Sequence, residues 1–321
     1  MGEVFGEGDT RPRGRREGQL IRFFATEDCL RQGTAGFVYR IAGQALWFEW
    51  PMQVLNGYVM QAPASAPQRE PCPGVEPDAP EVTVTGWLAG ANRRVTCRYD
   101  QSVYELDLTG LMRLVVTRTG NSVYCRATEQ GLKPAVLEEA VLGPPITIAL
   151  ALQDIWCLHA SALVRDGQAI LFLGASGRGK STLAAYCRSR SDTGFHRITD
   201  DIVPCALIGS RACAMPHFPQ LKLCASDQYS PDAPVAVPMK AILILRPTLD
   251  SPEIAIEPLP SLAGVKALID QTVAVGLFDR VLHLRHLRFL AALSGLVPVY
   301  QLLYPHNYGC LPKVYRALAG L

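Results

Sequence analysis

The stretch of sequence best suited to chemistry is a glycine-rich segment that carries a lysine and two hydroxyls. It matches G-x-x-x-x-G-K-[ST] at every fixed position and follows the apolar run 169–173; its residues are Gly174, Ala175, Ser176, Gly177, Arg178, Gly179, Lys180, Ser181 and Thr182. Glycines let consecutive backbone N–H groups surround a phosphate, and the N-terminus of a following helix adds partial positive charge. The order strand, turn and helix therefore predicts a phosphate-binding loop. In such a loop Lys180 reaches the terminal phosphates and Ser181 holds a magnesium ion.

Two adjacent carboxylates, Asp200 and Asp201, follow the segment 195–199 and lie about twenty residues beyond Lys180. One short helix and one strand fit in that interval, so both carboxylates can return to the phosphates. In a phosphoryl transferase, one such group helps to hold magnesium while the other orients or deprotonates the attacking hydroxyl. The alternative is a solvated turn after a strand. The sequence leaves open which carboxylate takes which role.

His159 and Lys222 are two further candidates. Asp166-Gly167 is a tight-turn dipeptide between the strand-like segments 158–163 and 169–173, and the resulting hairpin returns His159 to the same end of the sheet as the glycine-rich segment. His159 is either a catalytic residue or a packed core histidine. Lys222 either neutralises the transferred phosphate or lies on the surface.

Composition indicates a globular intracellular protein. The 321 residues are 49% hydrophobic and carry a net charge of +2, which gives no support for general affinity for nucleic acids or membrane surfaces. The ten cysteines form no C-x-x-C pair, so we expect reduced thiols in the cytoplasm. No apolar run approaches the roughly 18 to 20 residues of a membrane span, and the polar N-terminus does not resemble a secretory signal.

The order of patterns predicts three parts: a disordered tail (1–18), a β-rich domain with a mostly antiparallel sheet (19–145), and a catalytic α/β domain (146–321). In the β-rich domain we expect strands at 37–41, 44–48, 82–85, 94–97, 103–108 and 114–117, an exposed loop at 62–80, and helices at 133–142 and 146–153. Downstream we expect strands at 241–245 and 297–303, and helices at 260–273, 279–294 and 311–318. Leu282, Leu287, Leu290 and Leu293 fall on or near one face of the helix 279–294.

Taken together, these segments resemble the HPr kinase/phosphorylase superfamily, over about residues 139–321. The resemblance lies in Leu158-His-Ala-Ser-Ala162, the glycine-rich segment, Ile198-Thr-Asp-Asp201 and Val297-Pro-Val-Tyr-Gln-Leu-Leu-Tyr-Pro305. It implies an α/β fold with a P-loop catalytic domain like those of HPr kinase and phosphoenolpyruvate carboxykinase, and an ATP- and Mg²⁺-dependent serine kinase. The implied roles are Lys180 on the phosphates, Ser181 and Asp201 at the metal, Asp200 as the base and His159 beside the transferring group.

The sequence also departs from true HPr kinases. Residues 1–145 do not resemble their N-terminal domain, and the glycine-rich segment on which phosphorolysis depends is not recognised after the carboxylates, which disfavours HPr as the substrate. Kinase-like relatives that accompany lasso-peptide biosynthesis have a similar layout and phosphorylate a precursor peptide at its C-terminal serine. The leading interpretation is therefore a peptide or protein serine kinase with no nucleic-acid or membrane partner. A nucleotide-binding regulatory module and a carboxykinase-type metabolic enzyme are the alternatives, and a homo-oligomer stays open.

Overall fold

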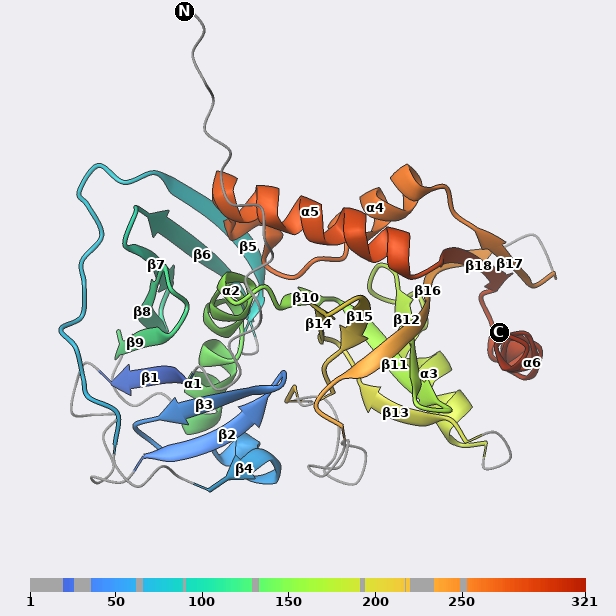
Figure 1. Ribbon diagram of the computed structural model, residues 1–321, viewed down its shortest axis with the longest axis horizontal. Coiled ribbons are helices and arrows are strands. Elements are labelled where there is room, and N and C mark those ends of the chain that lie inside the picture. The colour runs from blue at the N-terminus through green and yellow to red at the C-terminus, as the bar shows by residue number, and fades with distance from the viewer. Residues whose placement is uncertain are drawn as a thin grey trace, which may run out of the picture.

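The computed structural model describes residues 20–25, 36–61, 66–88, 91–128, 133–190, 194–216, 218–219, 234–248 and 253–321, without the side chain of residue 87. The predicted tail at 1–18 and the candidate Lys222 lie outside the described residues. The rest forms a mixed α/β structure with two large sheets and helices between and around them (Figure 1).

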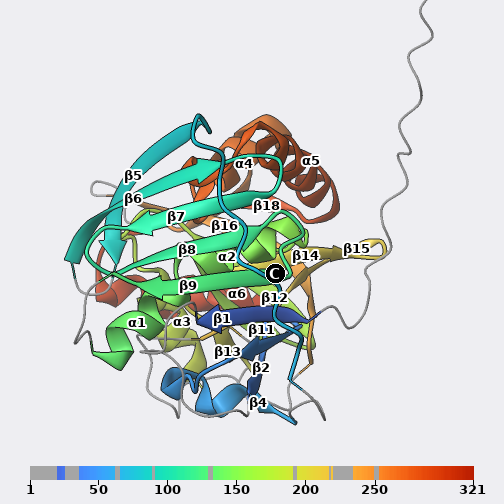
Figure 2. The same ribbon diagram turned by 90° about the vertical axis from the view of Figure 1, so that its left-hand side faces the viewer.

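The first sheet holds the strands that precede the glycine-rich segment, in the order β4-β2-β3-β1-β9-β8-β7-β6-β5 (Figure 2). The strands are β1 (Ile21–Ala25), β2 (Phe37–Ile41), β3 (Gln44–Phe48), β4 (Val59–Met60), β5 (Glu81–Leu88), β6 (Ala91–Tyr99), β7 (Val103–Leu108), β8 (Met112–Thr117) and β9 (Ser122–Ala127), and the 3-10 helix η2 (Gln53–Tyr58) precedes β4. The mostly antiparallel sheet is confirmed, since β1 pairs in parallel with β3 and β9 while the other described pairs are antiparallel. The predicted strands at 37–41 and 44–48 are also confirmed, and they pair as the hairpin β2–β3, whose turn residues Ala42 and Gly43 both have positive φ.

Two helices, α1 (Pro134–Val141) and α2 (Pro144–Leu152), lead from the first sheet to the second. They confirm the predicted helices, and α2 is buried from Pro145 to Ala151 because it packs against β8 and β10. Among the described residues, the stretch Pro134–Leu152 is long and apolar enough to cross a membrane, although the sequence had suggested no such run. Its most apolar window is 61% buried inside the protein, so core packing accounts for its composition.

The second sheet contains the glycine-rich segment, and its main path runs β10-β14-β15-β16-β12-β11-β13. The strands are β10 (Trp156–Leu158), β11 (Ala160–Arg165), β12 (Gln168–Leu173), β13 (His196–Thr199), β14 (Val203–Ile208), β15 (Arg211–Ala214), β16 (Val237–Thr248), β17 (Ala255–Pro258) and β18 (Val299–Pro305). β18 pairs with β16 in parallel and with β17 in antiparallel. β12 and β16 are also parallel, and β11 runs antiparallel to both β12 and β13. The described strands β14, β15 and β17 were not predicted.

The central strands of this sheet are buried on both faces. In β12, Ile170 and Phe172 pack into one core cluster while Leu171 and Leu173 pack into the other, because successive side chains point to opposite sides. The helices are α3 (Lys180–Arg188), α4 (Ser261–Ile269), α5 (Arg280–Leu296) and α6 (Leu311–Ala319), with the short 3-10 helices η4 (Val275–Leu277) and η5 (Tyr308–Cys310). α3 and α6 contribute to the cluster of Ile170 and Phe172, and α4 and α5 to the cluster of Leu171 and Leu173.

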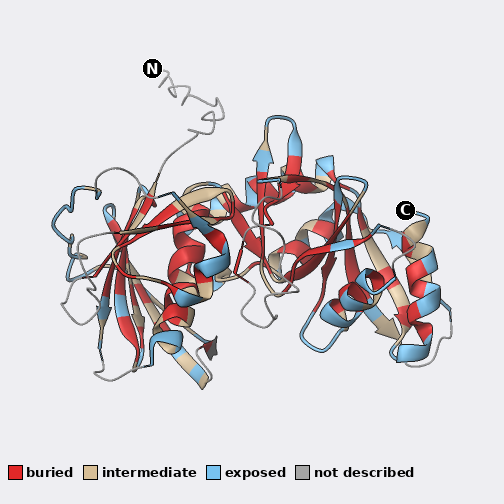
Figure 3. Cartoon of the chain, turned by 90° about the horizontal axis from the view of Figure 1, so that it is seen from below, coloured by how far each residue is buried: buried red, intermediate tan, exposed pale blue. Residues whose placement is uncertain are grey.

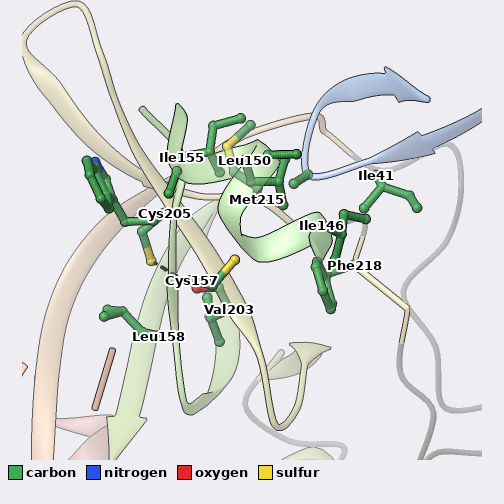
Figure 4. Packing of buried hydrophobic residues seen from close by; sticks show 14 of the residues in the cluster. Ile41, Ile146, Leu150, Ile155, Cys157, Leu158, Val203, Cys205, Met215 and Phe218 are labelled. Carbon is green, nitrogen blue, oxygen red and sulfur yellow. Dashed lines mark hydrogen bonds between the residues drawn. The ribbon is translucent and has the colours of Figure 1, made fainter. Parts of the chain in front are cut away.

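One core cluster includes residues from both sheets. Ile41 of β2, Ile146 of α2 and Val203 of β14 belong to it, and Figure 4 shows these side chains among the other buried residues of the cluster. Figure 3 shows buried residues on the helices between the sheets as well as on the strands. The two sheets therefore share one hydrophobic core. The predicted boundary at 145/146 falls inside α2, and the division into domains stays a prediction.

One detail of the predicted apolar face of α5 is wrong. Leu282, Leu290 and Leu293 are buried, but Leu287 is 43% exposed and His286 lies in the core instead. A polar side chain was not expected on the inner face. The burial of His286 is tolerated because its Nε2 lies 2.9 Å from the Thr272 hydroxyl.

Candidate functional site

Four segments meet at one edge of the second sheet. β12, β13, β16 and β18 run in the same direction, so the residues after their last positions gather at the same edge, and the start of the oppositely directed β11 joins them. The glycine-rich loop, here residues 174–182, follows β12, and Asp200 follows β13. His159 precedes β11, and His306 follows β18.

The glycine-rich loop has the backbone that its glycines make possible. Gly177 and Gly179 have φ of 78° and 83°, which an L-residue adopts only at a cost. Gly179 is the N-cap of α3, and no side chain caps this helix. Its first backbone N–H groups and its dipole are therefore available to an anion.

Lys180 is buried at the first position of α3 and points back over the loop. Its Nζ donates to the carbonyl oxygens of Gly174 and Ala175, at 2.6 and 3.3 Å. The ammonium therefore lies inside the curve of the backbone, where an anion held by the loop amides would meet it.

Asp200 is the buried carboxylate of the pair, with 6% of its surface exposed. Its Oδ1 accepts hydrogen bonds from the hydroxyls of Ser161 and Ser181, the second at 3.0 Å. Its Oδ2 forms an ion pair with the buried Arg197 at 2.7 Å. The structure thus brings Asp200 together with the hydroxyl of the glycine-rich loop.

Asp201 faces a different partner, although it is the next residue. Its φ of 73° is left-handed, a conformation that aspartate tolerates better than most residues, and it turns the second carboxylate away from the first. Its Oδ1 lies 3.2 Å from Nε2 of His159, and both side chains are more than a third exposed. The His159 backbone N–H donates to the Gln271 carbonyl at 2.7 Å, which fixes the position of the histidine.

Residues after β18 contact the opposite side of the loop. The Tyr304 hydroxyl donates to the Arg178 carbonyl, and Nε2 of His306 lies 3.2 Å from the Gly177 carbonyl oxygen. Burial raises the pKa of Tyr304 to about 12, so the phenol stays protonated and remains a donor. The Tyr304 hydroxyl also lies close to Gly179, so that a Cβ at position 179 would be only 3.2 Å from it.

These groups line a cleft of about 700 Å³, the size of a small-molecule site. Its lining includes every predicted site residue except Gly174 and Ala175: His159, Ser176, Gly177, Arg178, Gly179, Lys180, Ser181, Thr182, Asp200 and Asp201. Arg178 is exposed. No group of three or more His, Cys, Asp or Glu side chains suited to a metal occurs among the described residues. A metal at Ser181 and Asp200 would therefore take its other ligands from phosphate and water.

Sequence reasoning did not assign roles to four residues of the site: Ser161, Arg197, Tyr304 and His306. Arg197 could have been found from the sequence, because it is a charged residue followed directly by the buried strand residues Ile198 and Thr199. An arginine there requires a carboxylate partner within reach. Ser161, Tyr304 and His306 gave no such signal, since their contacts depend on pairing between distant strands.

Comparison with known proteins leaves the family open. No protein-family model matches the sequence, and no curated protein matches it significantly. Among solved structures, the chain is similar to the Hpr(Ser) kinase/phosphatase from Coxiella burnetii. The sequence identity is 16%, the TM-score is 0.30, and the match covers 51% of this chain and 94% of that chain. A TM-score this low does not establish a common fold, so membership of the family stays a prediction and the function proposed below rests on the geometry of the site.

Proposed function

We propose that the protein is an ATP- and magnesium-dependent kinase that transfers the γ-phosphoryl group to a serine hydroxyl of a peptide or small protein. The observation that carries this proposal is the arrangement of the two carboxylates. Asp200 meets the Ser181 hydroxyl of the glycine-rich loop, while Asp201 opens into the same cleft beside His159.

The loop and Lys180 would bind the triphosphate. Backbone N–H groups at the uncapped start of α3 point toward the anion, and Lys180 supplies a full positive charge. The ammonium now bonds to the Gly174 and Ala175 carbonyls, and phosphate oxygens would replace these with stronger charge-assisted bonds. The exposed Arg178 adds a second positive charge at the mouth of the cleft.

Ser181 and Asp200 fit a magnesium ion, because both present oxygen atoms, the Ser181 Oγ and the Asp200 Oδ1, 3.0 Å apart. Bound magnesium would neutralise charge on the β- and γ-phosphates. Ser161 and Arg197 hold the Asp200 carboxylate in place. This assignment reverses the roles implied by the family resemblance, in which Asp201 shares the metal with Ser181 and Asp200 is the base.

Asp201 would accept the proton of the acceptor serine. It is more exposed than Asp200, and an N–H on Nε2 of His159 would orient its carboxylate. As the serine Oγ bonds to the γ-phosphorus, the bond from that phosphorus to the β–γ bridging oxygen breaks. ADP leaves, and the hydroxyl proton moves to Asp201. Asp200 suits this step less well because its oxygens already accept bonds from two hydroxyls and a guanidinium.

The test combines binding and transfer for matched variants with labelled ATP, magnesium and serine peptides. Lys180→Ala should lose ATP binding. Asp200→Asn should weaken magnesium-dependent ATP binding, and Asp201→Asn should keep it but lower transfer by about 10²- to 10⁴-fold. Asp166→Asn is the matched control, since Asp166 is an exposed aspartate with positive φ in the turn between β11 and β12, at the other end of the sheet. Unchanged transfer by Asp201→Asn would remove the proposed base, and tight ATP binding without any phosphorylated product would favour a regulatory module.

For the acceptor, we propose a serine-bearing peptide, and the family resemblance suggests a C-terminal serine as in lasso-peptide precursors. The exposed position of Asp201 supports an acceptor that enters from solvent. Peptides identical except for a serine at the C-terminus, in the interior or replaced by alanine would separate these cases. Transfer to the interior serine alone would contradict the terminal preference.

A further inference from the structure

The cleft extends beyond the groups that the phosphate chemistry uses. Its lining also includes Tyr304, His306, Asn307, Tyr308, Leu311 and Val314, which come from the end of β18, η5 and the start of α6. These residues form a mixed aromatic and aliphatic wall beside the glycine-rich loop.

The order of strands gives the cleft two distinct ends. The glycine-rich loop follows β12; β11 and β13 lie on one side of this strand, and β16 and β18 on the other (Figure 1). His159 and Asp200 come from the first side, whereas residues 304–311 come from the second. A triphosphate on the loop, with its terminal phosphate at the carboxylates, therefore extends its other end toward residues 304–311.

Residues 304–311 are attached to the loop and internally braced. The contacts from Tyr304 to the Arg178 carbonyl and from His306 to the Gly177 carbonyl place this segment against the phosphate-binding turn. The Asn307 Oδ1 accepts a hydrogen bond from the Cys310 backbone N–H at 3.2 Å and so caps η5. The backbone that carries Tyr308 is thus held in position before any ligand arrives.

Tyr308 is 79% exposed and lines the same cleft as the buried Leu311 and Val314. Neighbouring Tyr304 and Tyr315 are buried, so Tyr308 is not needed for the core at this end of the sheet. An exposed aromatic ring in a cleft that is also lined by aliphatic side chains offers a flat apolar surface, and nucleobases stack on such surfaces.

From this geometry we propose that Tyr308, supported by Leu311 and Val314, is the stacking surface for the base of the nucleoside triphosphate. The inference rests on the proposed function, since the phosphate position sets the direction in which the base extends. Every base has a π-face, so a stack alone discriminates weakly. The Asn307 Oδ1 is engaged in the cap of η5. Mg·GTP should therefore bind within about tenfold of Mg·ATP.

The experiment compares calorimetric binding of Mg·ATP and Mg·tripolyphosphate, which shares the phosphates but lacks the nucleoside. The wild-type protein should bind ATP more tightly. Tyr308→Ala should weaken ATP binding roughly tenfold and leave tripolyphosphate binding unchanged, whereas Tyr308→Phe should retain both. Leu262→Ala on α4, another highly exposed apolar side chain, is the control and should change neither.

The possible outcomes separate the two proposals. Equal affinity of wild type for ATP and tripolyphosphate, or ATP binding by Tyr308→Ala at the wild-type affinity, overturns the base assignment and leaves the phosphate loop standing. A Tyr308→Ala variant that changes only the KM for the acceptor peptide also overturns it, because the ring would then contact the acceptor. Absence of binding of either ligand to the wild-type protein overturns the proposed function and this inference with it.

Discussion

The different environments of the two adjacent carboxylates predict different costs when each charge is removed. Asp200 is 6% exposed and is paired at 2.7 Å with Arg197, which is equally inaccessible. Asp201 has a side chain that is 39% exposed, and its Oδ1 lies beside the similarly exposed His159. The isosteric changes Asp200→Asn and Asp201→Asn therefore test the same chemistry in two environments.

The magnitude follows from what each change leaves behind. Asp200→Asn leaves the Arg197 charge buried, and the Arg197 Nε already lacks a hydrogen-bond partner among the described residues. Removal of one member of a buried pair costs about 3 to 5 kcal/mol, and the remaining amide oxygen favours the lower end, about 3 kcal/mol. Asp201→Asn should cost less than about 0.5 kcal/mol, because solvent screens an exposed pair.

Urea unfolding at pH 7 without nucleotide, followed by tryptophan fluorescence, measures both values. Asp166→Asn is the control for an exposed aspartate with positive φ and should match the wild type. Addition of Arg197→Met to Asp200→Asn should restore part of the loss, since the uncompensated charge is then removed. A loss below 1 kcal/mol for Asp200→Asn, or an equal loss for Asp201→Asn, would refute the assignment of the buried pair.

Three further predictions concern the histidine in the core, the loop and the contact between the turn after β8 and the start of α5. Burial lowers the pKa of His286 to about 4, so between pH 6.5 and 4 the unfolded chain binds a proton that the folded chain does not. The free energy of unfolding should therefore fall by up to about 1.4 kcal/mol per pH unit as the pH is lowered through this range. Urea unfolding of His286→Gln at the same pH values should show no such decrease from this residue. Gly179→Ala should cost about 1 to 2 kcal/mol at its φ of 83° and weaken ATP binding in calorimetry; unchanged stability would contradict the left-handed backbone. Arg118→Ala breaks a 2.5 Å ion pair with Asp279, the N-cap of α5, and should lower the free energy of urea unfolding by about 2 kcal/mol at pH 7. Burial alone would raise the pKa of Asp279, but hydrogen bonds from the α5 backbone and from Arg118 lower it. The loss caused by Arg118→Ala should therefore shrink as acid protonates the Asp279 carboxylate.

Local patterns in the sequence predicted much of the fold. The hairpin at Ala42-Gly43, the turn at Asp166-Gly167 and the strands β2, β3, β5, β6, β7 and β8 of the first sheet were recoverable because alternation and turn residues act over a few positions. The strands β1, β4 and β9 were missed. The partners of β1 are the parallel strands β3 and β9, and β9 lies almost a hundred residues further along the chain. The position of β1 between β3 and β9 depends on pairing with strands that are distant in the sequence, and local sequence patterns do not specify such pairing.

The sequence by itself determined the glycine-rich loop and the carboxylates at 200 and 201, because spacing and residue type specify the strand, turn and helix around them. The tertiary structure decided how those groups meet. The left-handed backbone at Asp201 separates two adjacent carboxylates, and the antiparallel pairing of β11 and β13 brings Ser161 to Asp200. β18, more than a hundred residues after the loop, brings Tyr304 and His306 to it. Functional residues within one continuous segment can be predicted from the sequence, but contacts between distant strands form only when the sheet forms.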